Sequence, residues 1–360
     1  MKAAIVSPYF KTLGGGEKYA LTFAQALLDK NWKVEITLYD RKIVEEARTR
    51  FGLPLKNIEI SDLSKFTNKN LFERISTHSK YDLMFWVSDG SIPLMFSKKN
   101  ILHFQIPFHD LRSGSIMDQI KFKRINKVVC NSLFTKQVID KEYKINSLVW
   151  YPPIDVEGFF PGKKENIILA VGRFEKSMTE KRQDVLIDVF KTMVNSGLKG
   201  WKFVLSGGCS EGNEDYLNNL KKTAKGFPIE FKANVPFIEI SELYSKAKIF
   251  WHAAGYGINE DIYPEKTEHF GMTTVEAMAS GCVAIVHAKG GQKEIIEEEV
   301  DGFLWNEKKQ LIDKTTNVIT NNDLMKNMAK KAVQKSKLFS KQIFYDKVND
   351  LIRLREIPRS

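Results

Sequence analysis

The sequence predicts an α/β protein with parallel sheets, because short apolar runs of strand length alternate with amphipathic segments of helical period. A second observation is that this alternation starts afresh after a turn-rich stretch near the middle of the chain. The third is length, since 360 residues with 43% hydrophobic content exceed what a single core usually holds. We therefore expect two α/β domains.

The first half begins with a strand expected at residues 2–7, followed by the glycine-rich turn Gly14-Gly15-Gly16. A helix is expected at 17–30, where apolar residues recur with helical period at Tyr19, Ala20, Phe23, Ala24, Leu27 and Leu28. Further strands are expected at 34–39, 83–87, 127–130 and 148–150. Tyr151-Pro152-Pro153 then marks a turn, because proline cannot donate a ladder hydrogen bond.

A fresh series of strands and helices begins after residue 164. Strands are expected at 166–171, 201–205, 229–231, 249–251 and 282–286. The helix between the first two is indicated by an apolar stripe at Val185, Leu186, Val189, Phe190 and Met193. We therefore place the linker near 152–165 and predict domains at 1–160 and 161–339. A terminal helix is expected within 340–360, with Ser340 as its cap.

Positive charge is concentrated in the first half. Residues 1–150 carry 24 Lys and Arg against 15 Asp and Glu. The difference of +9 accounts for most of the net charge of +11. The densest cluster is Lys121, Lys123, Arg124 and Lys127. Such a field favours anionic partners, so a membrane-facing patch and an ordinary solvated basic face both stay open.

Cysteine usage and hydropathy point to a reduced, cytoplasmic compartment. Cys130, Cys209 and Cys282 are odd in number and scattered, which predicts neither a disulfide framework nor a zinc site. No run approaches the roughly 18 apolar residues of a membrane-spanning helix. We expect a cytoplasmic protein, with peripheral contact at the inner face of the membrane as a further expectation.

The most informative segment runs from Glu268 to Gly281. Glu268 precedes a turn and Glu276 lies in the helix expected after it. A carboxylate accepts two hydrogen bonds at once, so it suits the vicinal hydroxyls of a sugar or ribose. The helix start between the two glutamates offers backbone N–H groups to a phosphate. Either glutamate alone could be an ordinary helix or loop residue, so the neighbouring motifs decide.

Two cations follow a strand in the same half of the chain. Arg173 comes directly after the strand expected at 166–171, and Lys181 lies just before the next helix, with Arg182 as its alternative. Cations at that edge can neutralise a diphosphate leaving group as it departs. Their position in the same domain as Glu268 predicts one shared site.

Other motifs are weaker or absent. His103 ends an apolar run and could hydrogen-bond a substrate hydroxyl, with His109 as the alternative. The turn before the first helix lacks G-x-G-x-x-G spacing, which disfavours a nicotinamide cofactor. No D-x-D pair, H-E-x-x-H, P-loop or G-x-S-x-G occurs in the sequence. We therefore expect no metal and no bound cofactor.

Taken in order along the chain, the motifs resemble a retaining glycosyltransferase of family 4. The similarity rests on motifs spread over nearly the whole chain: Gly14–Glu17, Asn131–Thr135, Tyr151–Asp155, Val171–Phe174, Glu268–Gly281 and Gly290–Ile295. The resemblance implies the GT-B fold, in which two Rossmann-like domains face each other across a cleft. The long polar segment Ala253–Lys266 resembles the subgroup that includes mannosyltransferases of lipid-linked oligosaccharides.

The resemblance also implies residue roles in the second domain. Arg173 and Lys181 would hold the donor diphosphate, Glu276 would bind the nucleotide ribose, and Glu268 would lie near the donor sugar. The remaining donor-binding positions implied there are Phe270, Gly271, Met272 and Thr273 near the sugar hydroxyls and phosphate, and Asn234 and Val235 beside the base.

In the first domain, the resemblance implies that His103 contacts the donor sugar and that Gly15 and Gly16 border the phosphates. The terminal helix would pack back on this domain. The expected reaction moves a hexosyl group from a nucleotide diphospho-sugar to an acceptor hydroxyl with retention of configuration and without a metal. GDP-mannose is the favoured donor and UDP-glucose its competitor.

The expected acceptor is a glycan or glycolipid bound mainly by the basic first domain. A sugar-nucleotide epimerase on the same scaffold is the alternative enzyme, since it would convert the donor without an acceptor. A nucleic-acid-binding protein is the remote alternative. That function predicts aromatic residues interleaved with Lys and Arg, and Phe122 is the only aromatic residue within the Lys121–Arg124 cluster. We therefore expect no nucleic-acid partner.

Overall fold

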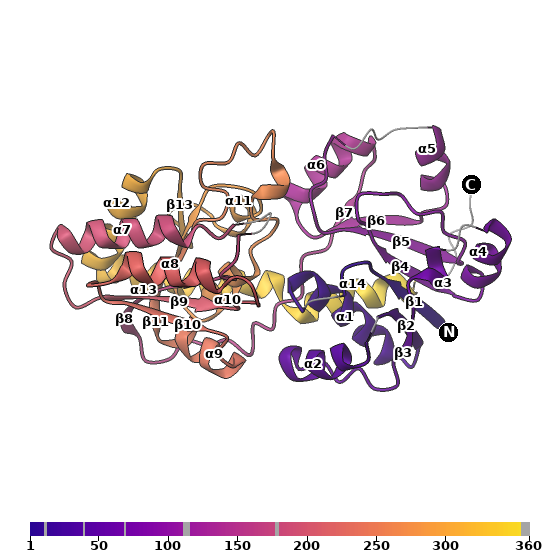
Figure 1. Ribbon diagram of the computed structural model, residues 1–360, viewed down its shortest axis with the longest axis horizontal. Helices are drawn as coiled ribbons and strands as arrows, with labels where there is room; N and C mark the ends of the chain where they lie inside the picture. The colour runs from indigo at the N-terminus through magenta and orange to yellow at the C-terminus, as the bar shows by residue number, and fades with distance from the viewer. Residues whose placement is uncertain (11–12, 39, 68–69, 111–115, 177–179, 354–360) are drawn as a thin grey trace. The chain divides into compact units, whose positions relative to one another are not determined.

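The structure is a computed structural model that describes residues 1–10, 13–38, 40–67, 70–110, 116–176 and 180–353. Tyr39, the last residue of the strand expected at 34–39, and the expected terminal helix from Leu354 onward lie outside these residues. The chain forms two compact units (Figure 1). Unit 1 is Met1–Pro153 with the segment from Lys341 onward, and unit 2 is Ile154–Ser340. The predicted α/β class with two parallel sheets is confirmed.

The contacts divide the chain after Pro153, seven residues before the division at 160 that the sequence suggested. The physical reason is that Ile154 forms a bridge with Ser340, and its N–H donates to the Phe339 carbonyl at 3.1 Å. Residues 154–160 are therefore attached to unit 2.

Unit 1 is built on a seven-stranded parallel sheet in the order β3-β2-β1-β4-β5-β6-β7. Its strands are β1 Lys2–Val6, β2 Lys33–Thr37, β3 Glu59–Ser61, β4 Leu83–Val87, β5 Lys99–Phe104, β6 Lys127–Cys130 and β7 Leu148–Val149. Its helices are α1 Gly15–Leu28, α2 Lys42–Phe51, α3 Ser64–Thr67, α4 Leu71–His78, α5 Ile116–Phe122, α6 Leu133–Tyr143 and α14 Lys341–Arg353.

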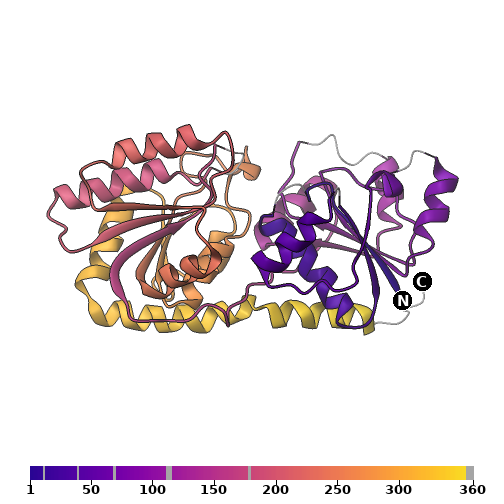
Figure 2. The ribbon, with the colours of Figure 1, turned by 60° about the horizontal axis from the view of Figure 1, so that its bottom comes forward.

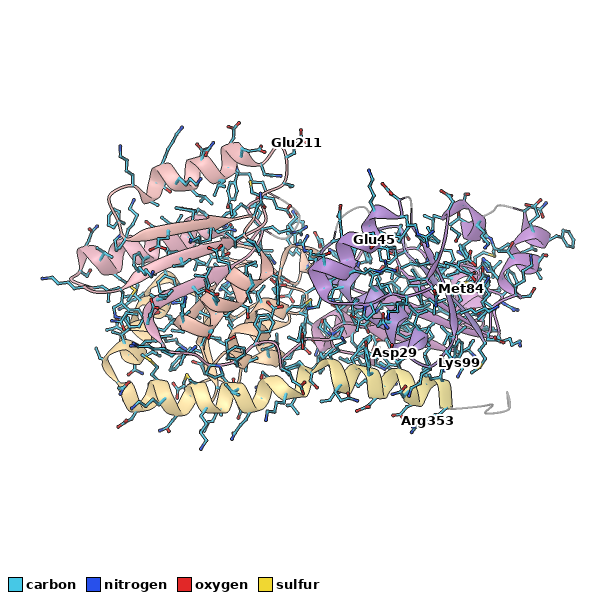
Figure 3. The ribbon with its side chains drawn as sticks, turned by 90° about the horizontal axis from the view of Figure 1, so that it is seen from below. Asp29, Glu45, Met84, Lys99, Glu211 and Arg353 are labelled. Atoms are coloured by element: carbon cyan, nitrogen blue, oxygen red, sulfur yellow. The ribbon has the colours of Figure 1, made fainter. Side chains whose placement is uncertain are left out.

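The two faces of this sheet bury alternate residues of each strand, as the period of a strand requires. In β1, Ala3 and Ile5 join a core with α1, α2 and α14, whereas Ala4 and Val6 join the opposite core with α3 and α6. Residues of α14 complete the first core although they lie far away in the sequence. Figure 3 shows this helix with Lys99 near its last turn, where the Lys99 ammonium donates to the Leu351 carbonyl at 2.7 Å.

Unit 2 is built on a six-stranded parallel sheet in the order β10-β9-β8-β11-β12-β13. Its strands are β8 Glu165–Val171, β9 Lys202–Gly207, β10 Ile229–Ala233, β11 Ala247–His252, β12 Val283–His287 and β13 Gly302–Trp305. Its helices are α7 Gln183–Asn195, α8 Glu214–Ala224, α9 Phe237–Lys246, η1 Pro264–Lys266, α10 Met272–Ala279, α11 Gln292–Ile295, α12 Lys308–Thr320, α13 Asn322–Ser336 and η2 Lys337–Phe339.

Helices lie on both faces of this second sheet (Figure 2). One core joins the sheet to α7, α8, α12 and α13. On the other face, Tyr244 of α9 packs against Phe250 of β11 with ring centroids 6.0 Å apart. Within the described part of the chain, no helix has the length and apolar character needed to cross a membrane.

Candidate functional site

The order of the strands in unit 2 identifies where a ligand can bind. The order reverses between β8 and β11, which are neighbours in space although β9 and β10 separate them in the sequence. The connections leave β8 and β11 in opposite directions, so a crevice forms at the carboxyl ends of these two strands. Gly172 follows β8 and His252 ends β11, so the loops they begin border this crevice.

A half-buried cluster of charged and polar side chains lies at this point. The Lys181 ammonium donates to Glu268 Oε2 at 2.7 Å, and His252 Nε2 lies 2.8 Å from the same oxygen. Burial alone would raise the pKa of Glu268, but the Lys181 charge and the His252 hydrogen bond outweigh burial and hold that pKa well below its usual range. Glu268 is therefore an ionised acceptor in a site largely shielded from water.

Gln292 fixes the orientation of the His252 ring. Its side-chain amide nitrogen lies 3.4 Å from His252 Nδ1, where it can donate a hydrogen bond. Nδ1 then acts as the acceptor, so the proton of a neutral ring lies on Nε2 and is donated to Glu268. Gln292 donates to His252, and His252 donates to Glu268. These two hydrogen bonds hold the carboxylate in one position.

Glycines allow the segments of the site to approach one another closely. Gly290 has φ +58°, and a Cβ there would lie 2.1 Å from the Glu268 carbonyl oxygen. A Cβ at Gly291 would lie 2.5 Å from the Phe270 Cα. The Gly291 N–H also donates to the Glu268 carbonyl at 2.8 Å. The Gly290-Gly291 turn therefore packs directly against residues 268–270 and fixes their position.

The start of α10 lies next to this turn. Gly271 is its N-cap with φ +119°, and a glycine has no side chain with which to cap the first N–H groups. Phe270 and Gly271 are buried, and Met272 and Thr273 are half-buried in the first helical turn. This end of the helix can direct N–H groups and the positive end of its dipole toward an anion.

Glu276 belongs to a second contact group on the same helix. The Tyr244 hydroxyl donates to Glu276 Oε2 at 3.1 Å and is 3.2 Å from the Thr273 carbonyl. Burial, followed by the Glu276 charge, raises the pKa of Tyr244 well above its ordinary value. Tyr244 is therefore a permanent donor that positions the Glu276 carboxylate.

The other residues predicted in this domain lie at the same carboxyl edge of the sheet but outside the Glu268 cluster. Arg173 has a side chain that is 55% exposed and pairs with Glu175 at 3.0 Å. Asn234 has φ +55°, and its amide bridges the Cys209 N–H and carbonyl, both at 2.8 Å. Val235 is half-buried beside it.

The predicted residues of the first domain lie in unit 1. Gly15 and Gly16 start α1, and a Cβ at Gly16 would lie 2.2 Å from Gln105 Oε1, so this glycine lets the Gln105 side chain cover the turn. His109 is half-buried, with Nδ1 3.1 Å from Asp110.

The position of His103 differs from what the sequence suggested. Its side chain is fully buried, and its ring stacks on Tyr19 at 4.2 Å between centroids and on Phe85 at 5.3 Å. Burial lowers its pKa to about 3. Alternation along β5 directs this ring into the core shared with α1, where its Nε2 is buried and has no hydrogen-bond partner among the described residues.

The sequence alone did not predict His252, Gln292 and Tyr244 as residues of the site. His252 was overlooked because the expected strand ended at Trp251, one residue before the end of β11. Histidine at the carboxyl end of a buried strand was a usable signal, but it was applied to His103. Tyr244 lies inside a helix, and nothing in its spacing indicates a partner 32 residues away.

Together these groups can bind an anionic sugar derivative. Glu268 and Glu276 offer oriented acceptors for hydroxyls, Lys181 and Arg173 offer positive charge, and the start of α10 offers N–H groups. Among the described residues, no group of three or more His, Cys, Asp and Glu side chains is arranged to hold a metal ion.

Comparison with known proteins gives a consistent result. Residues 153–335, just over half of the chain, match the family described as glycosyl transferases group 1. The chain is 28% identical over 249 residues to the GDP-Man:Man(3)GlcNAc(2)-PP-Dol alpha-1,2-mannosyltransferase of Xenopus laevis. The aligned region covers 64% of this chain and 46% of that protein. The chain therefore spans about half the length of this curated relative.

Solved structures show the same fold. A glycosyltransferase from Rickettsia africae superposes with a TM-score of 0.74 and 19% identity, covering 98% of this chain and 97% of that one. Alr3699/HepE of Anabaena, crystallised in complex with UDP, gives a TM-score of 0.74 with 15% identity, covering 98% of this chain and 100% of that one.

Proposed function

The chain belongs to the glycosyl transferases group 1 family, and from this premise we propose that it transfers a mannosyl group from GDP-mannose to an acceptor hydroxyl. UDP-glucose is the competing donor. The mannosyl preference is supported by the similarity to the GDP-mannose-dependent relative of Xenopus laevis.

One observation carries the proposal: the half-buried Lys181–Glu268–His252 cluster lies at the switch point of the unit 2 sheet, next to the start of α10. An ionised Glu268 accepts hydrogen bonds from sugar hydroxyls, and Glu276 accepts them from the nucleotide ribose. The N–H groups at the start of α10 and the Lys181 and Arg173 cations face the diphosphate.

The proposed chemistry retains the anomeric configuration. The bond between the anomeric carbon and the diphosphate oxygen breaks as the acceptor oxygen attacks from the same face. The acceptor proton passes to the departing phosphate oxygen, so atoms and charges balance. Positive charge from Lys181 and Arg173 stabilises the diphosphate as negative charge develops on it, without a metal ion.

We propose that the acceptor is a glycan or glycolipid bound mainly by unit 1, whose basic character suits an anionic acceptor. The protein would then act in the cytoplasm and in peripheral contact with the inner face of the membrane. The family match gives no support to the epimerase alternative. A nucleic-acid partner is not proposed, because it would leave the Glu268 cluster without a role.

A thermal-shift panel of nucleotide sugars tests the donor. GDP-mannose at 100 times its Kd should stabilise unit 2 by about 2.7 kcal/mol, because only the folded state binds it. UDP-glucose should give a smaller shift, and Lys181→Met should abolish both shifts. Transfer to an acceptor, with the product anomer assigned by NMR, tests the reaction. An inverted product, or conversion of the donor alone to an epimer, would refute the proposal.

A further inference from the structure

Two helices of unit 1 expose apolar side chains in the same pattern. In α4, Leu71, Phe72 and Ile75 are 49%, 83% and 38% exposed. In α5, Ile116, Met117 and Ile120 are 78%, 59% and 47% exposed. Each set occupies positions i, i+1 and i+4, so its members share one face of their helix. We call these six residues the apolar surface of unit 1.

The helix α5 packs on unit 1 mainly through its last residue, Phe122. None of its seven residues is buried, and a helix this short is not stable in water by propensity alone. Phe122 at its end packs partly against the core, with its ring 5.7 Å from Tyr143. The face carrying Ile116, Met117 and Ile120 lies opposite and remains in solvent.

Residues at the carboxyl-terminal ends of both helices contact the ring of Phe96. The ring of His78, the last residue of α4, lies 6.2 Å from the Phe96 ring. The Arg124 guanidinium, two residues after α5, lies 4.5 Å over the same ring. Figure 1 places α4 and α5 at the same end of unit 1. The carboxyl-terminal ends of α4 and α5 therefore lie on the same part of this unit.

Positive charge borders this region. Lys123 and Arg124 are exposed directly after α5, and Lys121 and Lys127 flank them. Lys121 pairs weakly with Asp118 at 3.5 Å. Near α4, Lys80 is exposed, and Lys98 is 75% exposed but paired with Asp82 at 2.7 Å. Apolar side chains next to exposed Lys and Arg are the arrangement that inserts into a bilayer interface and pairs with acidic headgroups.

We propose that the apolar surface of unit 1 inserts into an anionic lipid bilayer, with Lys121, Lys123 and Lys127 contacting the headgroups. Charge complementarity selects this occupant, because a neutral apolar groove on a protein partner would leave the basic rim unpaired. The inference deepens the membrane contact in the proposed function by naming the residues that make it. It depends on neither the donor nor the reaction.

Vesicle flotation of the full chain, without donor or acceptor, tests this surface. Vesicles of phosphatidylcholine with about 30% phosphatidylglycerol should bind the wild type, whereas pure phosphatidylcholine should bind it at least tenfold more weakly. Phe72→Ser/Ile116→Ser should reduce binding more than tenfold. Lys121→Gln/Lys123→Gln should weaken binding roughly fivefold per charge and remove its salt dependence in part.

Matched variants in unit 2 provide the controls. Phe160 and Ile238 are 63% and 68% exposed, so Phe160→Ser/Ile238→Ser removes comparable apolar surface. Lys326→Gln/Lys331→Gln removes two exposed charges from α13. Both should bind vesicles as the wild type does. Circular dichroism and donor-induced thermal shift establish that every variant is folded.

Three outcomes would overturn the proposal. The first is a wild type that does not bind anionic vesicles, and the second is equal binding by Phe72→Ser/Ile116→Ser and the wild type. The third is concentration-dependent dimerisation, abolished by Phe72→Ser in sedimentation experiments, in a chain that binds no vesicles. Because no outcome uses transfer, an inactive wild type would refute the proposed function and leave this result unaffected.

Discussion

At the scale of single residues, two buried histidines illustrate how the neighbours of a side chain determine its role. His252 donates to the ionised Glu268 and is oriented by Gln292, so both ring nitrogens have polar partners. His103 has the Val129 carbonyl 3.2 Å from Nδ1 and aromatic rings on its faces. The first histidine positions a carboxylate, and the second fills a core.

We therefore predict opposite effects for the two alanine variants. His252→Ala should lower kcat/KM roughly 100-fold, because Glu268 loses the donor that holds it in place. His103→Ala should lower the free energy of unfolding by about 3 kcal/mol, yet reduce kcat/KM per folded molecule less than tenfold. Urea unfolding and initial-rate measurements on both variants check this. A folded His103→Ala protein as inactive as His252→Ala would contradict the core role.

A buried carboxylate in unit 1 gives stability that depends on pH. Glu35 accepts from Lys65, from the Tyr81 hydroxyl at 2.6 Å and from Lys2 at 3.0 Å. Burial alone would raise the pKa of Glu35, but these donors outweigh burial and lower it to about 2. A carboxyl whose folded pKa is depressed stabilises the fold above its unfolded pKa, and that stability is lost as pH falls toward the folded pKa.

Replacement of Glu35 should therefore change stability in a pH-dependent way. Glu35→Gln should unfold about 2–3 kcal/mol more easily than the wild type at pH 7. The difference should stay constant down to about pH 5 and shrink between there and pH 2, since the wild type then binds the proton too. Urea titrations at several pH values measure it. A difference that is independent of pH would show that Glu35 acts through packing alone.

The residues of the site were only partly predictable from the sequence. Glu268 and Glu276 were singled out by the spacing of one motif, and Lys181 by its position just before an expected helix. His103 and His252 could not be separated, because both follow an apolar strand. The face on which a strand-end side chain emerges depends on the boundary of the strand, and sequence patterns locate such boundaries poorly.

At the scale of elements, the turn at Gly290-Gly291 determines the position of the segment that carries Glu268. The strand and helix alternation predicted both sheets, but the short β3 and β13 were not identified. The contact between the β12–α11 turn and residues 268–270 joins segments 20 residues apart, so no local pattern could reveal it.

Gly290 and Gly52 form a matched pair for testing this turn. Both have nearly equal φ values, +58° and +63°, so alanine introduces similar backbone strain at each. At Gly290 the new Cβ would also meet the Glu268 carbonyl oxygen, whereas nothing lies within 4 Å of a Cβ at Gly52. Gly290→Ala should therefore weaken donor binding more than tenfold, and Gly52→Ala should not change it.

Isothermal titration with the preferred donor measures this difference. Each variant should also lose about 1 kcal/mol of stability from strain at positive φ. Equal donor affinities in the two variants would indicate that the segment from Glu268 to Phe270 adjusts without cost to the site.

At the scale of the whole molecule, the chain returns from unit 2 to unit 1 within a few residues. Phe339 packs in unit 2, with its ring 5.5 Å from Phe270 beside the candidate site. Phe344 packs in unit 1, with its ring 4.9 Å from Tyr19 at an angle of 82°. Periodicity predicted the terminal helix with Ser340 as its cap, but a sequence pattern does not show which unit each of the two phenylalanines packs against.

Alanine at these two positions should destabilise different units. Phe344→Ala should weaken unit 1 by about 3–5 kcal/mol, because it empties the contact between α14 and α1. Hydrogen–deuterium exchange should then rise in peptides from β1 and α1 and stay unchanged in those from β8 and β11. Phe339→Ala should give the reverse pattern and weaken donor binding through Phe270. Equal increases in hydrogen–deuterium exchange in both units for either variant would mean that the two cores unfold together. In that case, stability and donor affinity could not be altered separately.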